Sequence, residues 1–179
     1  MKLRTSYFDA TILKKNITRF APVWGLYSAF LLMLFMVAVE LDSQGVRTAS
    51  NLAETISGFA VGNCIYAFAV AQLLWGDLYN SRMCNALHAL PLPRDCWFGS
   101  HVASGIAFSL LPNVVITLIS LPILRLGNGW ISVLWWLLAS ELQYLFFFGT
   151  AALCVMLSGN RLGQLALYGI IQFAGLLCY

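Results

Sequence analysis

The chain alternates between long apolar runs and short polar connections. Five runs, at about residues 21–39, 57–77, 102–124, 130–157 and 162–179, are each long enough to cross a hydrocarbon core of about 30 Å as a helix. Apolar residues follow one another in these runs without the alternation of a barrel strand. Because only helices and closed barrels satisfy the backbone in lipid, the pattern predicts an all-α transmembrane bundle with five spans.

Composition points to the same class. Hydrophobic residues make up 60% of the chain and charged residues only 9%, whereas about a quarter of a soluble domain is charged. The run from Phe20 to Val39 is long enough to span and is followed by no clear cleavage site, so we interpret it as an uncleaved first span. The five cysteines show no closely spaced framework, and we expect no disulfide.

The basic residues predict the orientation. With the N-terminus in the cytoplasm, only Arg47 and Arg125 lie outside. The other basic residues then lie inside: Lys2, Arg4, Lys14, Lys15, Arg19, Arg82, Arg94 and Arg161. This bias favours a cytoplasmic N-terminus.

Residues 1–20 are predicted to form a cytoplasmic amphipathic elbow helix before the transmembrane domain, residues 21–179. Asp9 is a candidate N-cap, and Pro22 supplies a bend into the first span. One face carries Ala10, Leu13, Ile17, Phe20 and Trp24, and the other carries Lys15 and Arg19. In the interfacial interpretation, Lys14, Lys15 and Arg19 meet anionic head groups while Phe20 enters the acyl boundary. In the alternative, the basic residues only set the topology.

Residues 78–101 form the one long polar passage in the middle of the chain. It contains Arg82, followed by an apolar segment with two prolines: Leu87, Leu90, Pro91, Leu92 and Pro93. Arg94 and Asp95 come next, and they are predicted to begin a helix that continues into the next span. Prolines restrict the backbone, so the segment is a candidate stiff element that transmits force to a span. The alternative is a solvated basic turn that only satisfies the topology.

This loop, and the segment Phe8 to Tyr27, resemble type-2 ABC transporter permeases, in particular the Firmicute-type members. The resemblance covers roughly Phe8 to Gly105. It implies a permease subunit of the bacterial cytoplasmic membrane, an exporter that works as a homo- or heterodimer. It also implies a separate ATPase, which would bind the ATP and dock on the loop 78–101.

The chain departs from the family pattern in two respects. Pro93 stands where Ser or Thr often caps the following helix, and Ser100-His101 stands where a Gly-Lys pair is frequent. Proline can still open a helix at its first position, so we expect the turn to form without the usual cap and without the usual charge contact. The family usually has six or more spans, and the chain ends at Tyr179 inside its fifth apolar run, so we expect a truncated member or fragment.

Glu141 is the only acid well inside a predicted span, with Ser140, Gln143 and Tyr144 beside it. An ionisable group at that depth is energetically costly, and such groups usually serve a function. Glu141, Gln143 and Asn113 are therefore candidates for a translocation path. In the alternative, Glu141 lies nearer an interface or bonds to Gln72 or Asn113 for helix packing.

Two further patterns are weaker. Pro112 predicts a kink whose freed carbonyl is satisfied by a neighbouring group, and Gly58 with Gly62 forms a small-xxx-small pair. Cys84 with His88, and Cys96 with His101, have spacings that would suit zinc. The paired C-x2-4-C spacing is absent, so we expect no metal site there and expect His88 to pack at the interface.

The chain has no P-loop, no paired carboxylates and no nucleophile dyad in its spans, so we predict that it is not an enzyme and needs no cofactor of its own. An ATP-independent transporter or channel, or an accessory membrane protein, remains the alternative to a permease subunit.

Overall fold

The computed structural model describes residues 9–38, 40–42, 45–47, 49–80, 85, 94–124 and 130–177, with side chains described for 9–36, 59–80, 85, 94–119 and 133–175. The helices are α1 (Ala10–Arg19), α2 (Ala21–Ala38), α3 (Ala49–Trp75), the short 3-10 helix η1 (Gly76–Tyr79), α5 (Arg94–Leu124), α6 (Trp130–Leu157) and α7 (Arg161–Leu177). Strands β1 (Glu40–Asp42) and β2 (Gly45–Arg47) pair antiparallel, with Leu41 opposite Val46. The predicted helical fold class is confirmed, and each predicted span overlaps one of the long helices.

Three helical stretches of the described residues are long and apolar enough to cross a membrane: Phe59–Tyr79, Arg94–Ile119 and Val133–Leu157. A fourth is added if α1 and α2, which meet at an angle of 66°, form one broken span. Large apolar side chains such as Met33, Ile65 and Trp135 are exposed on these helices, as expected for surface that faces lipid. These features are those of a helical membrane protein, with three to four candidate spans among the described residues.

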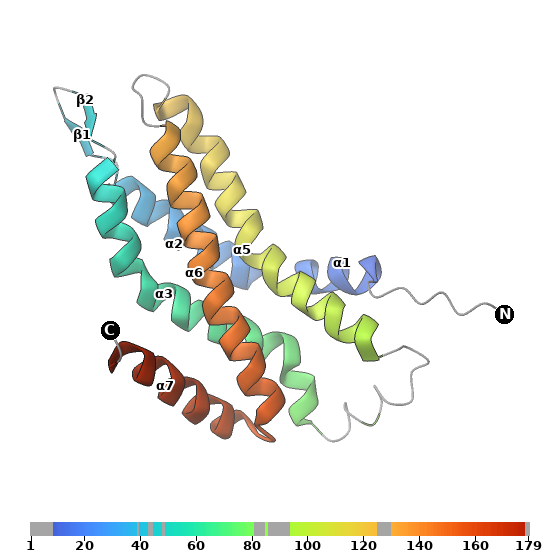
Figure 1. The fold of residues 1–179 in the computed structure, drawn as a ribbon. Coiled ribbons are helices and arrows are strands. Elements are labelled where there is room, and N and C mark those ends of the chain that lie inside the picture. The colour runs from blue at the N-terminus through green and yellow to red at the C-terminus, as the bar shows by residue number, and fades with distance from the viewer. Residues whose placement is uncertain are drawn as a thin grey trace.

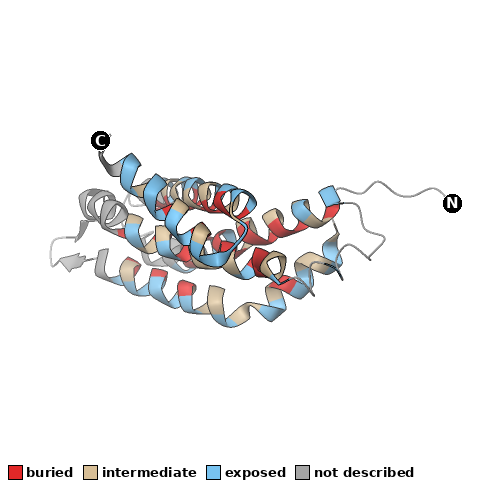
Figure 2. Cartoon of the chain, turned by 90° about the horizontal axis from the view of Figure 1, so that it is seen from below, coloured by how far each residue is buried: buried red, intermediate tan, exposed pale blue. Residues whose placement is uncertain are grey.

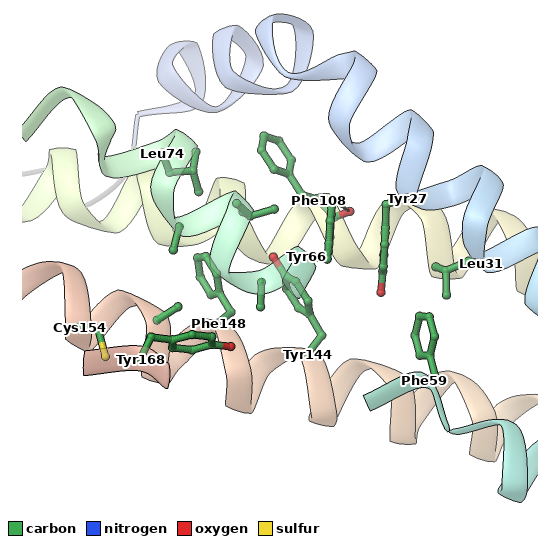
Figure 3. Packing of buried hydrophobic residues seen from close by; sticks show 14 of the residues in the cluster. Tyr27, Leu31, Phe59, Tyr66, Leu74, Phe108, Tyr144, Phe148, Cys154 and Tyr168 are labelled. Atoms are coloured by element: carbon green, nitrogen blue, oxygen red, sulfur yellow. Dashed lines mark hydrogen bonds between the residues drawn. The ribbon is translucent and has the colours of Figure 1, made fainter. Parts of the chain in front are cut away.

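The long helices pack around α6, which lies against both α3 and α5 (Figure 1). Helix α2 lies behind them and packs on α5 and α3. Buried positions concentrate on the facing sides of these helices, whereas their outer sides are exposed (Figure 2). The core is rich in aromatic rings: Tyr27 and Tyr66 stack with their centroids 3.7 Å apart (Figure 3).

The two ends of the bundle carry different connections (Figure 1). The β1–β2 hairpin lies at one end, with the last turns of α5 and the first turns of α6. Helix η1, the first turn of α5 and the turn between α6 and α7 lie at the other end. Arg94 and Arg161, each the first residue of its helix, are therefore at the end opposite the hairpin and Arg47.

Helix α1 begins where the sequence predicts. The Asp9 carboxylate accepts a hydrogen bond of 2.8 Å from the Thr11 backbone N–H, which caps the first turn. The helix ends at Arg19, Phe20 is its C-cap, and the chain turns directly into α2, where Pro22 lies in the first turn. A proline there loses no intrahelical hydrogen bond, because the first N–H groups of a helix have no partner inside it.

Helix α1 packs against α5 through polar contacts as well as apolar ones. The Asn16 amide donates to the Ser104 hydroxyl at 3.0 Å, and the Asp9 backbone N–H donates to the Ser100 hydroxyl at 2.9 Å. Ile17 and Phe20 pack on the buried cluster, with the Phe20 ring edge-on to Phe108. The apolar face predicted to enter lipid is thus partly used against the protein itself.

Helix α5 continues through Pro112 without a break. Proline cannot donate to the carbonyl four residues earlier, which belongs to Phe108. That carbonyl instead accepts a hydrogen bond of 3.1 Å from the Tyr66 hydroxyl of α3. A neighbouring group satisfies the freed carbonyl, as the sequence predicts, and the bond ties α3 to α5 at mid-helix.

Candidate functional site: a buried polar cluster around Glu141

Glu141 lies on the buried side of α6 and is 9% exposed. Its Oε1 atom accepts a hydrogen bond of 2.9 Å from the Asn113 amide and one of 3.1 Å from the Ser109 hydroxyl. Ser109 and Asn113 are four residues apart on α5, so they lie on the same face of that helix. Of the two packing partners considered from the sequence, Asn113 forms the bond, whereas Gln72 is half-buried on α3.

One oxygen in this cluster accepts no hydrogen bond. Asn113 turns its amide nitrogen toward Glu141 and Ser109, which leaves Oδ1 buried and unpaired. The Ser140 hydroxyl, next to Glu141 in sequence, is also buried, and it interacts with the Tyr27 hydroxyl of α2. An unsatisfied buried polar atom is uncommon in native proteins, so the Asn113 oxygen calls for an explanation.

A second set of polar side chains extends the cluster across the bundle. The Tyr27 hydroxyl lies beside Ser109, Ser140 and Glu141, and it donates to Asn63 Oδ1 at 2.7 Å. The Asn63 amide in turn donates to Gln143 Oε1 at 2.9 Å. Polar groups from α2, α3, α5 and α6 therefore meet in the middle of the bundle.

In the part of the chain that the structure describes, no positively charged side chain is found beside Glu141. Among the described residues its polar partners are Asn113 and Ser109, both neutral. The titratable groups that face it are the phenols of Tyr27, Tyr66 and Tyr144. An ionised carboxylate in this environment would lack a compensating charge.

The loop predicted to couple to an ATPase has two well-anchored flanks. At its start, the Tyr79 hydroxyl of η1 donates to Gln164 Oε1 of α7 at 2.7 Å. At its end, Trp75 of α3 contacts Phe98 of α5, with ring centroids 6.0 Å apart. Both flanks are thus fixed to the bundle, at the end opposite the β1–β2 hairpin.

Part of the predicted coupling set lies within the described residues. Arg94 and Asp95 form the first turn of α5, and both side chains are exposed. The rest of the set lies outside the described residues: Arg82, Leu87, Leu90, Pro91 and Leu92.

The predicted interface residues are on α1. Lys14, Lys15 and Arg19 are exposed, whereas Phe20 is half-buried. The Arg19 guanidinium stands 5.1 Å from the centre of the Phe20 ring, a cation–π distance. The basic side chains therefore point away from α5 while Phe20 faces the bundle.

The residues considered for zinc are only partly described. Cys96 and His101 are both buried on α5, and His101 Nδ1 contacts the Trp97 carbonyl at 3.0 Å. Cys84 and His88 lie outside the described residues. In the described part of the chain, no three His, Cys, Asp or Glu side chains come together to hold a metal ion.

Sequence reasoning identified Glu141, Asn113 and Gln143 but missed several partners. Ser109 could have been found, because it precedes Asn113 by four residues on a predicted helix. Asn63 is a polar residue within a predicted span, which is a weaker signal. Nothing in the sequence distinguishes Tyr27 from the other aromatic residues of the chain.

No protein-family model matches the chain, and no curated protein or solved structure is significantly similar to it.

Proposed function

We propose that this chain is a membrane-spanning permease subunit of an ABC transporter, an exporter driven by a separate ATPase that docks on the loop 78–101. The observation that carries the proposal is the continuity of α5. Its first turn presents Arg94 and Asp95 to solvent, and the same helix continues to Leu124 through a candidate span. A motor domain that pushes on this turn would displace the whole helix, because no flexible linker intervenes.

The anchoring of the loop supports the same role. Tyr79, at the start of the loop, is hydrogen-bonded to Gln164 of α7, and Phe98, near its end, packs against Trp75 of α3. Leu87, Leu90 and Leu92 would form the apolar part of the segment, with Pro91 restricting the backbone. Force applied to such a segment passes into α3, α5 and α7 together.

The proposal includes a complete topology. The chain would cross a bacterial cytoplasmic membrane five times, at about 21–39, 57–77, 102–124, 130–157 and 162–179, with a cytoplasmic N-terminus. Helix α1 would lie at the cytoplasmic interface, with Lys14, Lys15 and Arg19 facing head groups. Two such subunits, identical or different, would form the transporter, with Glu141, Gln143 and Asn113 near the translocation path.

We expect an ATPase with a P-loop to co-purify with the tagged chain from native membranes, identified by mass spectrometry. Arg94→Glu should reduce this recovery by about tenfold or more, because a charge at a docking surface is reversed. Ser43→Glu is the control: it also introduces a negative charge, but between β1 and β2 in the sequence, and the hairpin lies at the end of the bundle opposite Arg94, so recovery should be retained. Failure of any such ATPase to co-purify with the wild-type chain would refute the proposal.

The topology predicts a labelling pattern for single cysteines on a cysteine-free background. Asn85→Cys, at an exposed position in the loop, should react with an impermeant thiol reagent only from the cytoplasmic side. Gln44→Cys, between β1 and β2, should react only from outside. Asn85 is a better reporter than Cys96, whose side chain is 4% exposed. The reverse pattern would overturn the orientation.

A second candidate function is an ATP-independent transporter or channel. The observation in its favour is the polar cluster at mid-bundle, because polar groups facing the interior of a membrane bundle often belong to ion or substrate pathways. Transport by the purified chain alone in proteoliposomes, without an ATPase or ATP, would favour this function over the permease subunit.

A further inference from the structure

The Glu141 carboxyl group has only neutral neighbours among the described residues. Helix α5 faces it with the Asn113 amide and the Ser109 hydroxyl. The titratable groups that face it are phenols, from α2, α3 and α6 itself: Tyr27, Tyr66 and Tyr144. None of these groups carries a positive charge, and burial of an ionised carboxylate without one is strongly unfavourable.

The two carboxyl oxygens of Glu141 have different surroundings. Oε1 accepts both hydrogen bonds, from Asn113 at 2.9 Å and from Ser109 at 3.1 Å. Within the described part of the chain, Oε2 accepts none. An ionised carboxylate is an acceptor at both oxygens, whereas a neutral acid has one carbonyl oxygen and one hydroxyl oxygen that carries the proton. The bonding pattern therefore matches a neutral acid, with Oε1 as its carbonyl oxygen.

The surface of the carboxyl group is open on the Oε2 side. Asn113 and Ser109, which cover Oε1, have no exposed surface. Oε2 is not among the fully buried atoms that lack a partner, in agreement with the 9% exposure of Glu141. A proton needs no further ligand there, whereas a metal ion would require several oxygens around it. Oε2 is thus the atom at which a proton can bind and leave.

We propose that Glu141 is a proton-binding site, which holds a proton on Oε2 at neutral pH and exchanges it with the surroundings. Asn113 and Ser109 position the group by their hydrogen bonds to Oε1. Acids placed in this way inside membrane bundles form the proton relays of pumps and transporters. The inference does not depend on an ATPase partner, because protonation is a property of the isolated chain.

The test is infrared spectroscopy of the purified protein in detergent, with its glutamates labelled with carbon-13 at the side-chain carboxyl group. The chain has three glutamates, Glu40, Glu54 and Glu141. The wild type should show the carbonyl stretching band of a protonated, labelled carboxylic acid at neutral pH. Transfer to D2O should shift this band, because the proton on Oε2 exchanges. Glu141→Gln should remove it, and circular dichroism of each variant establishes that the helices are retained.

Ser109→Ala keeps the test decisive if Glu141→Gln does not fold, since it leaves the acid in place. It removes one hydrogen bond to the carbonyl oxygen Oε1, so the band should move to higher frequency. Two control variants should leave the band as it is in the wild type. Glu54→Gln makes the same substitution near the start of α3, outside the candidate span Phe59–Tyr79, and Ser28→Ala removes a hydroxyl that donates to the Gly25 carbonyl in α2.

Wild-type protein without this band at neutral pH would overturn the proposal, because Glu141 would then be ionised. An unchanged band in both Glu141→Gln and Ser109→Ala would also overturn it, because the protonated glutamate would then be another one. A band that does not shift in D2O would overturn the exchange of the proton. Each of these results leaves the ATPase question untouched, because co-purification is measured separately.

Discussion

Gly105→Leu is expected to force α5 and α6 apart. A Cβ atom at Gly105 would overlap the Phe148 ring, with Cε2 at 2.6 Å, so the ring occupies the space of any side chain there. Tyr144 also donates to the Gly105 carbonyl at 2.9 Å, which fixes the two helices at this close approach. Even one or two extra methylene groups in a packed core typically destabilise by about 1–3 kcal/mol, and a leucine adds more. We expect a loss of more than about 3 kcal/mol, measured as a lower unfolding midpoint in detergent.

Gly149 provides the matched control on α6, one residue after Phe148. No atom lies within 4 Å of a Cβ built there, so Gly149→Leu should leave the midpoint unchanged or raise it slightly, since leucine favours helix more than glycine does. A smaller ring should also relieve the clash: Gly105→Leu should cost less in a Phe148→Leu background than in the wild type. Equal effects of leucine at both glycines would contradict the close-approach interpretation.

Trp75→Ala should be the second most disruptive change. The Trp75 side chain has no exposed surface, and its ring contacts those of Phe98 and Phe148, with the Phe148 centroid at 5.6 Å. Truncating a buried tryptophan to alanine typically costs about 3–5 kcal/mol, because the cavity forfeits packing contacts. For a chain of this size, we expect the unfolding midpoint to fall by roughly 6 °C or more.

Trp135→Ala is the control for tryptophan truncation. Trp135 is 65% exposed on α6, on the surface that would face lipid, so its removal opens no cavity and should shift the midpoint by much less. Because Trp75 braces the start of α5 beside the loop, Trp75→Ala should also reduce recovery of the proposed ATPase. Equal shifts from both truncations would show that Trp75 is not a packing centre.

The positions of the helices were largely predictable because span length and hydropathy are local properties of the sequence. The five apolar runs fall on α2, α3, α5, α6 and α7, with some differences at their ends. The Asp9 cap and the carbonyl freed by Pro112 were also predictable, since each depends on residues within one turn of the same helix.

The contacts between helices could not be predicted in the same way. A helix that is apolar on all sides carries little information about which face meets its neighbours and which meets lipid. Asn16 bonds to Ser104, 88 residues away, so α1 packs on α5 although its pattern also fits a helix lying free at a membrane surface.

The sequence by itself determined that Glu141 is the one acid well inside its apolar run, and it predicted either a functional site or a packing partner for it, because charge and hydropathy are local properties. Only the tertiary structure decided which partners it has. The fold brings Ser109 and Asn113 to Glu141 from α5, and it brings Tyr27 to the same place from α2. It also leaves the Asn113 Oδ1 atom without a donor. These outcomes depend on the relative rotation and depth of packed helices, which are set by long-range contacts such as that of Gly105 with Phe148.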